Sequence, residues 1–203
     1  MLSGILHSQS KTVTFAAIIL AGSALLSSLL AFVRERLLAS RFGAGDELDA
    51  YLAAFGIPDF LYGILVMGGL AASFLPVFSD YAQKSREEAW RFASNLLNAA
   101  LVALGIFSLL LFFLAPVLVH AIAPGFSQEK LDLTTGLMRI MFLSPLFFAL
   151  SSVFSSVLHY FNRFLAYALA PLAYNIGIIL GILFLSPAFG IWGVVMGVVL
   201  GAS

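Results

Sequence analysis

The chain has 203 residues, of which 62% are hydrophobic and only 10% are charged. This composition excludes a water-soluble globular surface, which carries about 25% charged residues, and predicts an integral membrane protein. Ten Lys and Arg residues balance ten Asp and Glu residues, which argues against a nucleic-acid partner, and the lack of Cys excludes disulfides and thiolate metal sites.

A helix needs about 20 mostly apolar residues to cross the hydrocarbon core, so the chain has room for about six spans and little else. Five spans are predicted at Val13–Val33, Ala50–Phe78, Phe92–Ile122, Thr134–Tyr160 and Leu165–Leu185. A sixth apolar run opens at Ser186-Pro187 and reaches Ser203 without a charge, so we expect a chain that is cut within its sixth helix. Residues 1–203 are therefore predicted to form a single all-α transmembrane domain.

The first predicted span ends at the charged triplet Arg34-Glu35-Arg36, and a Gly-containing loop leads to Asp49 at the start of the second span. This loop could bring Arg34 and Asp49 together as a gate pair. The alternative is ordinary interfacial charge that extends to water, which is favoured for Glu35 and Arg36.

Gly and Pro residues interrupt the second predicted span, and Asp59 follows Pro58 inside it. Irregular backbone survives in a bilayer only where it is buried in protein or lines a wet cavity, so this span is the predicted cavity wall. An ionised carboxylate there needs a cation, a proton or water, which makes Asp59 a candidate binding residue. An interfacial or capping role is the alternative.

Other polar groups are less informative. Arg139 lies one turn into the fourth predicted span and faces either a central cavity or the interface. Asn95, Asn98 and Asn175 favour interhelical hydrogen bonds over a binding site. The His residues are scattered and no nucleophile or phosphate-loop motif occurs, so neither a metal site, a cofactor nor an enzyme is expected.

Several motifs follow one another in a fixed order. Between Phe32 and Tyr81 they are Arg34-Glu35, the FGAG turn Phe42–Gly45, Asp49-Ala50, Ile57-Pro58-Asp59, and Gly68-Gly69 leading to Phe74-Leu75-Pro76-Val77. Ala123-Pro124-Gly125-Phe126, Asn162-Arg163-Phe164 and Ala170-Pro171 with Asn175 come later. In this order and spacing the chain resembles the MurJ/MviN family over essentially its whole length.

The resemblance implies the N-terminal lobe of a two-lobed transporter of the multidrug/oligosaccharidyl-lipid/polysaccharide (MOP) flippase superfamily. Such a protein moves lipid-linked peptidoglycan precursor (lipid II) across the bacterial cytoplasmic membrane by alternating access, for cell-wall biogenesis. Its expected partners are that precursor, membrane lipid and a missing C-terminal lobe. A cationic central cavity is expected to hold the pyrophosphate and sugar head group, a role that suits arginine.

By the resemblance, Arg34 matches a cavity arginine and Asp49 an acidic gate residue. We therefore predict substrate binding by Arg34, Asp59 and Arg139, and a gate formed by Arg34, Glu35 and Asp49.

The chain also departs from the family pattern. Ser28 and Tyr62 stand where arginines are common, and Met67 where a glutamate is common. Asp59 in place of asparagine adds a negative charge. The anionic head group is then bound differently, or the substrate differs.

Three other functions compete with this one. A related MOP exporter of polysaccharide-linked lipids or cationic drugs would suit Asp59. A non-transporting membrane scaffold would suit a complete protein of this length. An intramembrane enzyme acting on polyprenyl phosphate ranks last, because no acid-base pair or metal cluster supports it.

Overall fold

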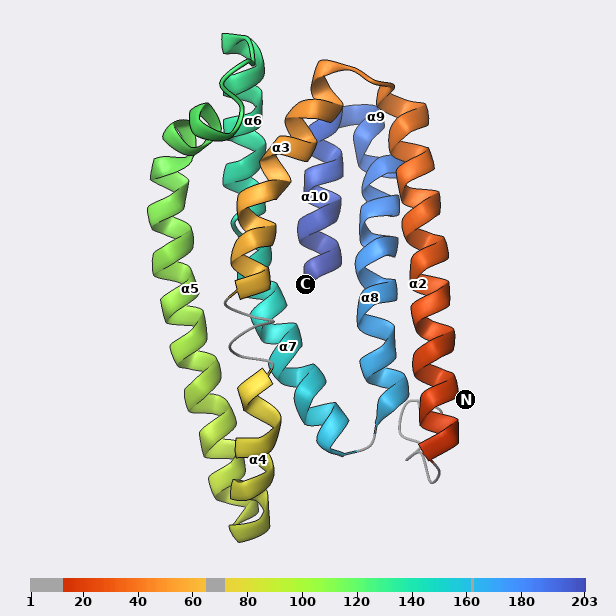
Figure 1. Ribbon diagram of the computed structural model, residues 1–203, viewed down its shortest axis with the longest axis vertical. Helices are drawn as coiled ribbons and strands as arrows, with labels where there is room; N and C mark the ends of the chain where they lie inside the picture. Colours follow the sequence, from red (N-terminus) through yellow and green to blue (C-terminus); the bar gives the residue numbers. More distant parts are fainter. Residues whose placement is uncertain (1–12, 65–71, 162) are drawn as a thin grey trace.

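The computed structural model describes residues 13–64, 72–161 and 163–203. Every regular element within these residues is helical, and Figure 1 shows the long helices running up and down beside one another. The elements are α2 Val13–Phe42, α3 Asp46–Leu61, α4 Ala72–Lys84, α5 Arg86–Ile122, α6 Gln128–Met141, α7 Ser144–Tyr160, α8 Phe164–Leu180, the π-helical turn η2 Gly181–Leu185, α9 Ser186–Phe189 and α10 Ile191–Ala202. The predicted all-α membrane fold is confirmed.

Helix α2 is longer than the sequence predicted. It continues past the charged triplet to Phe42, so Arg34 lies inside the helix and not at its end. The physical reason is that α2 packs along α8, where the Arg34 side chain has a hydrogen-bond partner, so its charge does not require the helix to stop. At 30 residues, α2 has a length of about 45 Å and exceeds the hydrocarbon core.

The described residues of the second predicted span form the helices α3 and α4. Helix α3 ends at Leu61 and continues as a π-helical turn through residues 62–64, and α4 begins at Ala72. In Figure 1, α3 occupies the upper half of the molecule and α4 the lower end. Pro58 lies inside α3, where it cannot donate to the helix ladder. Gly68-Gly69 and Met67 lie outside the described residues.

The number of spans is four in the described part of the chain, by length and composition. They are Ala17–Phe42, Arg86–Ile122, Gln128–Tyr160 and Ala168–Phe189, with Ile191–Ala202 as a shorter apolar helix. The prediction of about six is not confirmed, because the described part of the second span forms two shorter helices and α10 has only 12 residues. The fourth predicted span is interrupted before Pro145, since α6 ends at Met141 and α7 starts at Ser144.

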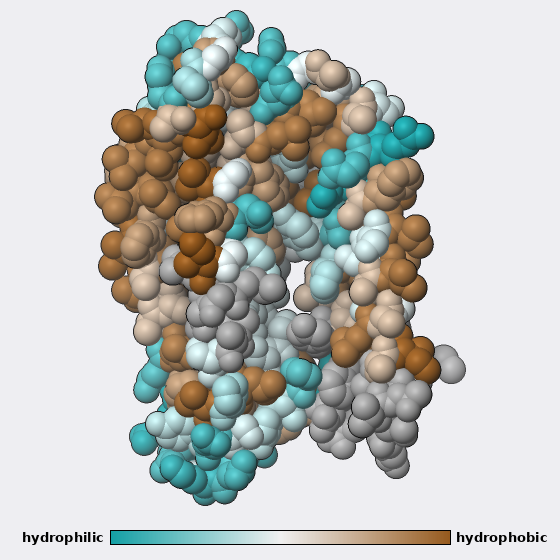
Figure 2. Space-filling view, in the orientation of Figure 1, coloured by the Kyte–Doolittle hydropathy of each residue, from teal (hydrophilic) through white to brown (hydrophobic). Residues whose placement is uncertain are grey.

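The outer face of the bundle is apolar. Along α5, large side chains at helical spacing are more than half exposed, namely Val102, Ile106, Leu109, Phe113 and Val117. Figure 2 shows hydrophobic residues along the flanks and hydrophilic residues gathered at the two ends. This distribution suits a bundle whose flanks contact lipid and whose ends contact water.

Candidate functional site

The candidate site is a cavity of about 410 Å³ inside the bundle. Helices α3, α4, α7, α8 and α10 all contribute to its wall, and Figure 2 shows the molecule hollowed near its centre. The polar or aromatic lining residues are Asp59, Tyr62, Phe148, Ser151, Ser152, Ser155, Ser156, His159 and Tyr174. None of the described lining residues is Lys or Arg.

Helix α7 supplies a hydroxyl-bearing wall. Its sequence contains two serine pairs, Ser151-Ser152 and Ser155-Ser156, followed by His159. Residues four apart lie on one face of an α-helix, so the two pairs and the histidine point to the same side. The valines between them, Val153 and Val157, are buried in the packed core on the other side of the helix.

Asp59 enters the cavity from the last turn of α3. It lies at mid-height in the bundle, where α3 ends in Figure 1, and the helix leaves the regular α pattern three residues later. Such π-helical turns are frequent at functional sites. Asp59 is exposed to the cavity, and no Lys or Arg among the described residues forms an ion pair with it.

Three aromatic rings stand beside this carboxylate. The ring centroids of Tyr62 and Phe148 are 4.5 Å apart, and those of Phe148 and Tyr174 are 5.2 Å apart. The three rings therefore form a contiguous patch that joins α3, α7 and α8. Next to it, a small cavity of about 10 Å³ is lined by Asp59 and by Ser144, whose buried hydroxyl has no hydrogen-bond partner within the described residues.

Arg34 belongs to a polar network between α2 and α8. Its Nη1 donates to Asn175 Oδ1 at 3.1 Å, and its Nη2 donates to Glu35 Oε1 at 2.6 Å. Asn175 Nδ2 in turn donates to Ser27 Oγ at 3.1 Å and to the Pro171 carbonyl at 3.1 Å. The predicted interhelical role of Asn175 is confirmed.

The gate pair expected between Arg34 and Asp49 is not formed. Asp49 lies in the first turn of α3 and accepts a hydrogen bond from Lys130 Nζ at 2.7 Å, while Asp46 accepts one from the same Nζ at 2.8 Å. Lys130 also stands 4.2 Å from the centroid of the Phe126 ring. A local partner on α6 therefore satisfies Asp49, and the loop after α2 does not bring it to Arg34.

Arg139 is placed away from the cavity. Its Nε donates to the Phe112 carbonyl of α5 at 3.2 Å, and its guanidinium lies 5.0 Å from the Phe112 ring centroid. The turn of α6 that carries Arg139 faces α5, and Arg139 is not among the described residues that line the cavity. Its contacts in the structure join α5 to α6.

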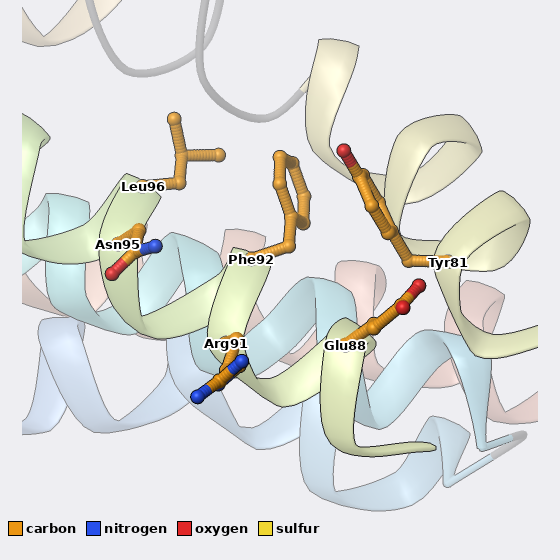
Figure 3. A pocket seen from close by; sticks show the side chains of 6 residues that line it. All are labelled: Tyr81, Glu88, Arg91, Phe92, Asn95 and Leu96. Atoms are coloured by element: carbon orange, nitrogen blue, oxygen red, sulfur yellow. The ribbon is translucent and has the colours of Figure 1, made fainter. Parts of the chain in front are cut away.

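A second pocket, of about 440 Å³, lies at the end of the bundle where α4 meets the start of α5. Figure 3 shows Tyr81 of α4 beside Phe92 and Glu88 of α5, and the rings of Tyr81 and Phe92 stack with centroids 5.2 Å apart. Arg91 and Asn95 complete its polar lining. The polar residues around this pocket lie on the helical segments α4 and α5.

Sequence reasoning missed most of this site. It identified Asp59, but it assessed His159 only as a metal ligand and did not single out the α7 serines. The signal was present in the spacing of two serine pairs and a histidine within an apolar span. Among the described residues, no three His, Asp or Glu side chains gather where they could hold a metal ion.

An apolar helical bundle that encloses a carboxylate and several hydroxyl groups in a cavity defines a multi-pass membrane protein. The family model described as Lipid II flippase MurJ matches residues 38–203, and the chain belongs to this family. It is therefore a multi-pass protein of the bacterial cytoplasmic membrane.

Comparison with individual proteins of known family gives the same family. The chain is 36% identical over 182 residues to a probable lipid II flippase MurJ of Buchnera aphidicola subsp. Acyrthosiphon pisum, covering 85% of this chain and 36% of the relative. It is 31% identical over 191 residues to the lipid II flippase MurJ of Thermosipho africanus, covering 94% of this chain and 39% of the relative. A solved lipid II flippase MurJ in an inward closed conformation superposes with a TM-score of 0.77 at 31% identity, covering 91% and 39% of the two chains. The chain thus spans little more than a third of these proteins.

Proposed function

We propose that this chain forms the N-terminal lobe of a flippase that moves lipid-linked peptidoglycan precursor across the bacterial cytoplasmic membrane by alternating access. Membership of the MurJ family, together with a polar cavity inside a lipid-facing bundle, carries the proposal. The C-terminal lobe, the precursor and membrane lipid are its proposed partners. Transport of this kind moves a molecule without changing its bonds, so the protein is proposed to be a transporter and not an enzyme.

Arg34 is proposed to contact the pyrophosphate together with groups from the second lobe. Its guanidinium makes three hydrogen bonds, one from each nitrogen, to Glu35 and Asn175. Since a guanidinium carries five N–H donors, two remain for a phosphate oxygen. The side chain is 22% exposed, so it is oriented by its partners and still reachable. Glu35 and Asp49 are proposed to act in the gate, Glu35 by holding Arg34 and Asp49 by holding Lys130.

The second predicted span supports a role in movement. Pro58 lies inside α3, and the helix leaves the regular α pattern in the π-helical turn at residues 62–64. Transporter sites commonly lie at discontinuous helices near the middle of the bilayer. We propose that this segment flexes as the two lobes rock about the cavity.

The test is Arg34→Ala in the full-length protein that carries this lobe, expressed in cells depleted of their own flippase. Translocation is read from the exposure of the precursor at the outer leaflet to an added degrading enzyme. Loss of one charge-assisted phosphate contact, worth about 1.5–3 kcal/mol, should slow translocation by about tenfold or more. Arg36→Ala is the matched control, because Arg36 is exposed on the same helix, with its guanidinium 5.9 Å from the Phe32 ring centroid. Normal translocation by Arg34→Ala would refute this role.

A further inference from the structure

The lining of the 410 Å³ cavity has a charge opposite to that expected for an anion site. Asp59 is its only carboxylate among the described lining residues, and no described lining residue is Lys or Arg. Arg34, the cation expected to serve the cavity, is turned to Asn175 and Glu35 in the seam between α2 and α8. A phosphate placed in this cavity would meet the Asp59 carboxylate, the serine hydroxyl groups and the His159 imidazole, with no Lys or Arg in the described lining.

From this geometry we infer that the cavity of this lobe binds a positively charged organic group, of the alkylammonium class, at Asp59. A carboxylate inside a membrane bundle is costly unless it pairs with a cation, and the described residues supply none. A cation, a proton or water can meet this need, and we take a cation from the bound molecule because the aromatic rings that line the same cavity suit an ammonium group. This inference rests on the proposed function only for the identity of the molecule that carries the ammonium group.

The aromatic patch indicates an organic ammonium in preference to a bare metal cation. Tyr62, Phe148 and Tyr174 line the same cavity as Asp59, and their rings contact one another in sequence. Cations are attracted to the faces of aromatic rings, and this is a common way to recognise alkylated ammonium groups. The three rings give the cavity an apolar surface beside the charge of Asp59, and the serine hydroxyl groups lie along the α7 wall.

Four serines of α7 add neutral hydrogen-bonding groups to the cavity wall. Ser151, Ser152, Ser155 and Ser156 present hydroxyl groups along α7 that can donate to or accept from the neutral polar part of the same ligand. The cavity volume of about 410 Å³ accommodates a small polar head group. In this arrangement the cavity of this lobe binds the ammonium group and the neutral polar groups of the ligand. Arg34 and the second lobe hold its phosphates.

The lack of Cys in the chain permits a direct measurement of charge preference. Ser155→Cys places a single thiol in the cavity wall of this lobe. The full-length protein, with any Cys outside residues 1–203 replaced by Ser, is treated in lipid nanodiscs with two methanethiosulfonate reagents. One carries a trimethylammonium group and the other a sulfonate. Each rate is normalised to the rate of the same reagent with free cysteine. We expect the cationic reagent to react about tenfold faster than the anionic one.

Two variants assign the preference to Asp59. In the Ser155→Cys background, Asp59→Asn should remove the preference, and Tyr62→Arg, which introduces a cation on the same wall, should reverse it. Asp80→Asn is the control, since Asp80 is an exposed carboxylate on α4 that does not line the cavity. The decisive protein carries Ser155→Cys and no second substitution. Equal labelling rates, a faster anionic reagent, or no reaction with either reagent in this protein would overturn the inference.

Protection experiments separate the ligand classes. Propylammonium chloride should slow the cationic labelling at least threefold more than sodium chloride at the same ionic strength. Equal slowing by the two salts would mean charge screening alone and would contradict an organic ammonium site. Because labelling needs no lipid substrate, a protein that fails to flip the precursor but keeps its cation preference would refute the proposed function and leave this inference standing.

Discussion

Gly181 and Gly197 face each other across the contact between η2 and α10 so closely that neither position has room for a side chain. A Cβ atom added to either glycine would lie 2.7 Å from the Cα atom of the other. One turn along, a Cβ atom on Gly177 would collide with the Cα atom of Gly201, while a Cβ atom on Gly201 would collide with the Tyr174 backbone. Small residues at four-residue spacing therefore form a seam of α8 and η2 against α10. Such seams let helix backbones approach in membranes, where apolar burial alone gives no preference for protein over lipid.

Gly197→Ala should therefore destabilise the bundle by about 1–3 kcal/mol, because backbone atoms and not flexible side chains obstruct the new methyl group. The measurement is thermal or denaturant unfolding in detergent micelles. Gly105→Ala on α5 is the control, since a Cβ there meets nothing within 4 Å. Unchanged stability of Gly197→Ala would show that α10 is not held against η2 and α8 in this way.

Asn175→Ala should loosen α2 from α8. The substitution removes the acceptor of the Arg34 Nη1 hydrogen bond and the donor to Ser27 and Pro171. Interhelical hydrogen bonds in membranes contribute about 0.6–1.7 kcal/mol each, so unfolding in micelles should shift by that order. Asn98→Ala on α5 should have no measurable effect, since Asn98 is exposed. If the two variants behave alike, the network does not hold the helices together.

Lys130 and Asp49 should be energetically coupled. The Lys130 side chain is 11% exposed, whereas the side chains of Asp46 and Asp49 are 83% and 55% exposed. A largely covered ammonium group therefore forms ion pairs with two solvent-exposed carboxylates. Lys130→Met and Asp49→Asn should each lower the melting temperature, and the double variant should lose less than the two losses combined. Additive losses, or losses independent of salt concentration, would argue against a direct ion pair.

Trp192 and Gly136 predict a second tight contact, between α10 and α6. A Cβ on Gly136 would collide with the six-membered ring of the Trp192 indole. Gly136→Ala should therefore destabilise the protein, and adding Trp192→Leu should recover part of the loss by removing the obstructing ring. Unfolding of the single and double variants in micelles measures this compensation. A double variant less stable than Gly136→Ala would show that the two residues act independently.

The sequence by itself determined the class of molecule. Apolar runs of spanning length, with charge confined mostly to their ends, can bury their backbone groups in a bilayer only as helices. The ordered motifs from Arg34 to Pro76 indicated the family, and the glycines and prolines of the second span predicted its interruption. These features are local, since each depends on residues near one another along the chain.

Only the tertiary structure decided which polar groups meet. Arg34 pairs with Asn175 across 141 positions of sequence, and Asp49 with Lys130 across 81, so neither partner could be read from neighbouring residues. Helix rotation turned Arg139 toward α5 and the α7 serines toward the cavity, and a rotation of this kind depends on how neighbouring helices pack. In a chain that is apolar on most faces, periodicity marks the helices but leaves their inward faces undefined, and only close packing, as between Gly181 and Gly197, fixes them.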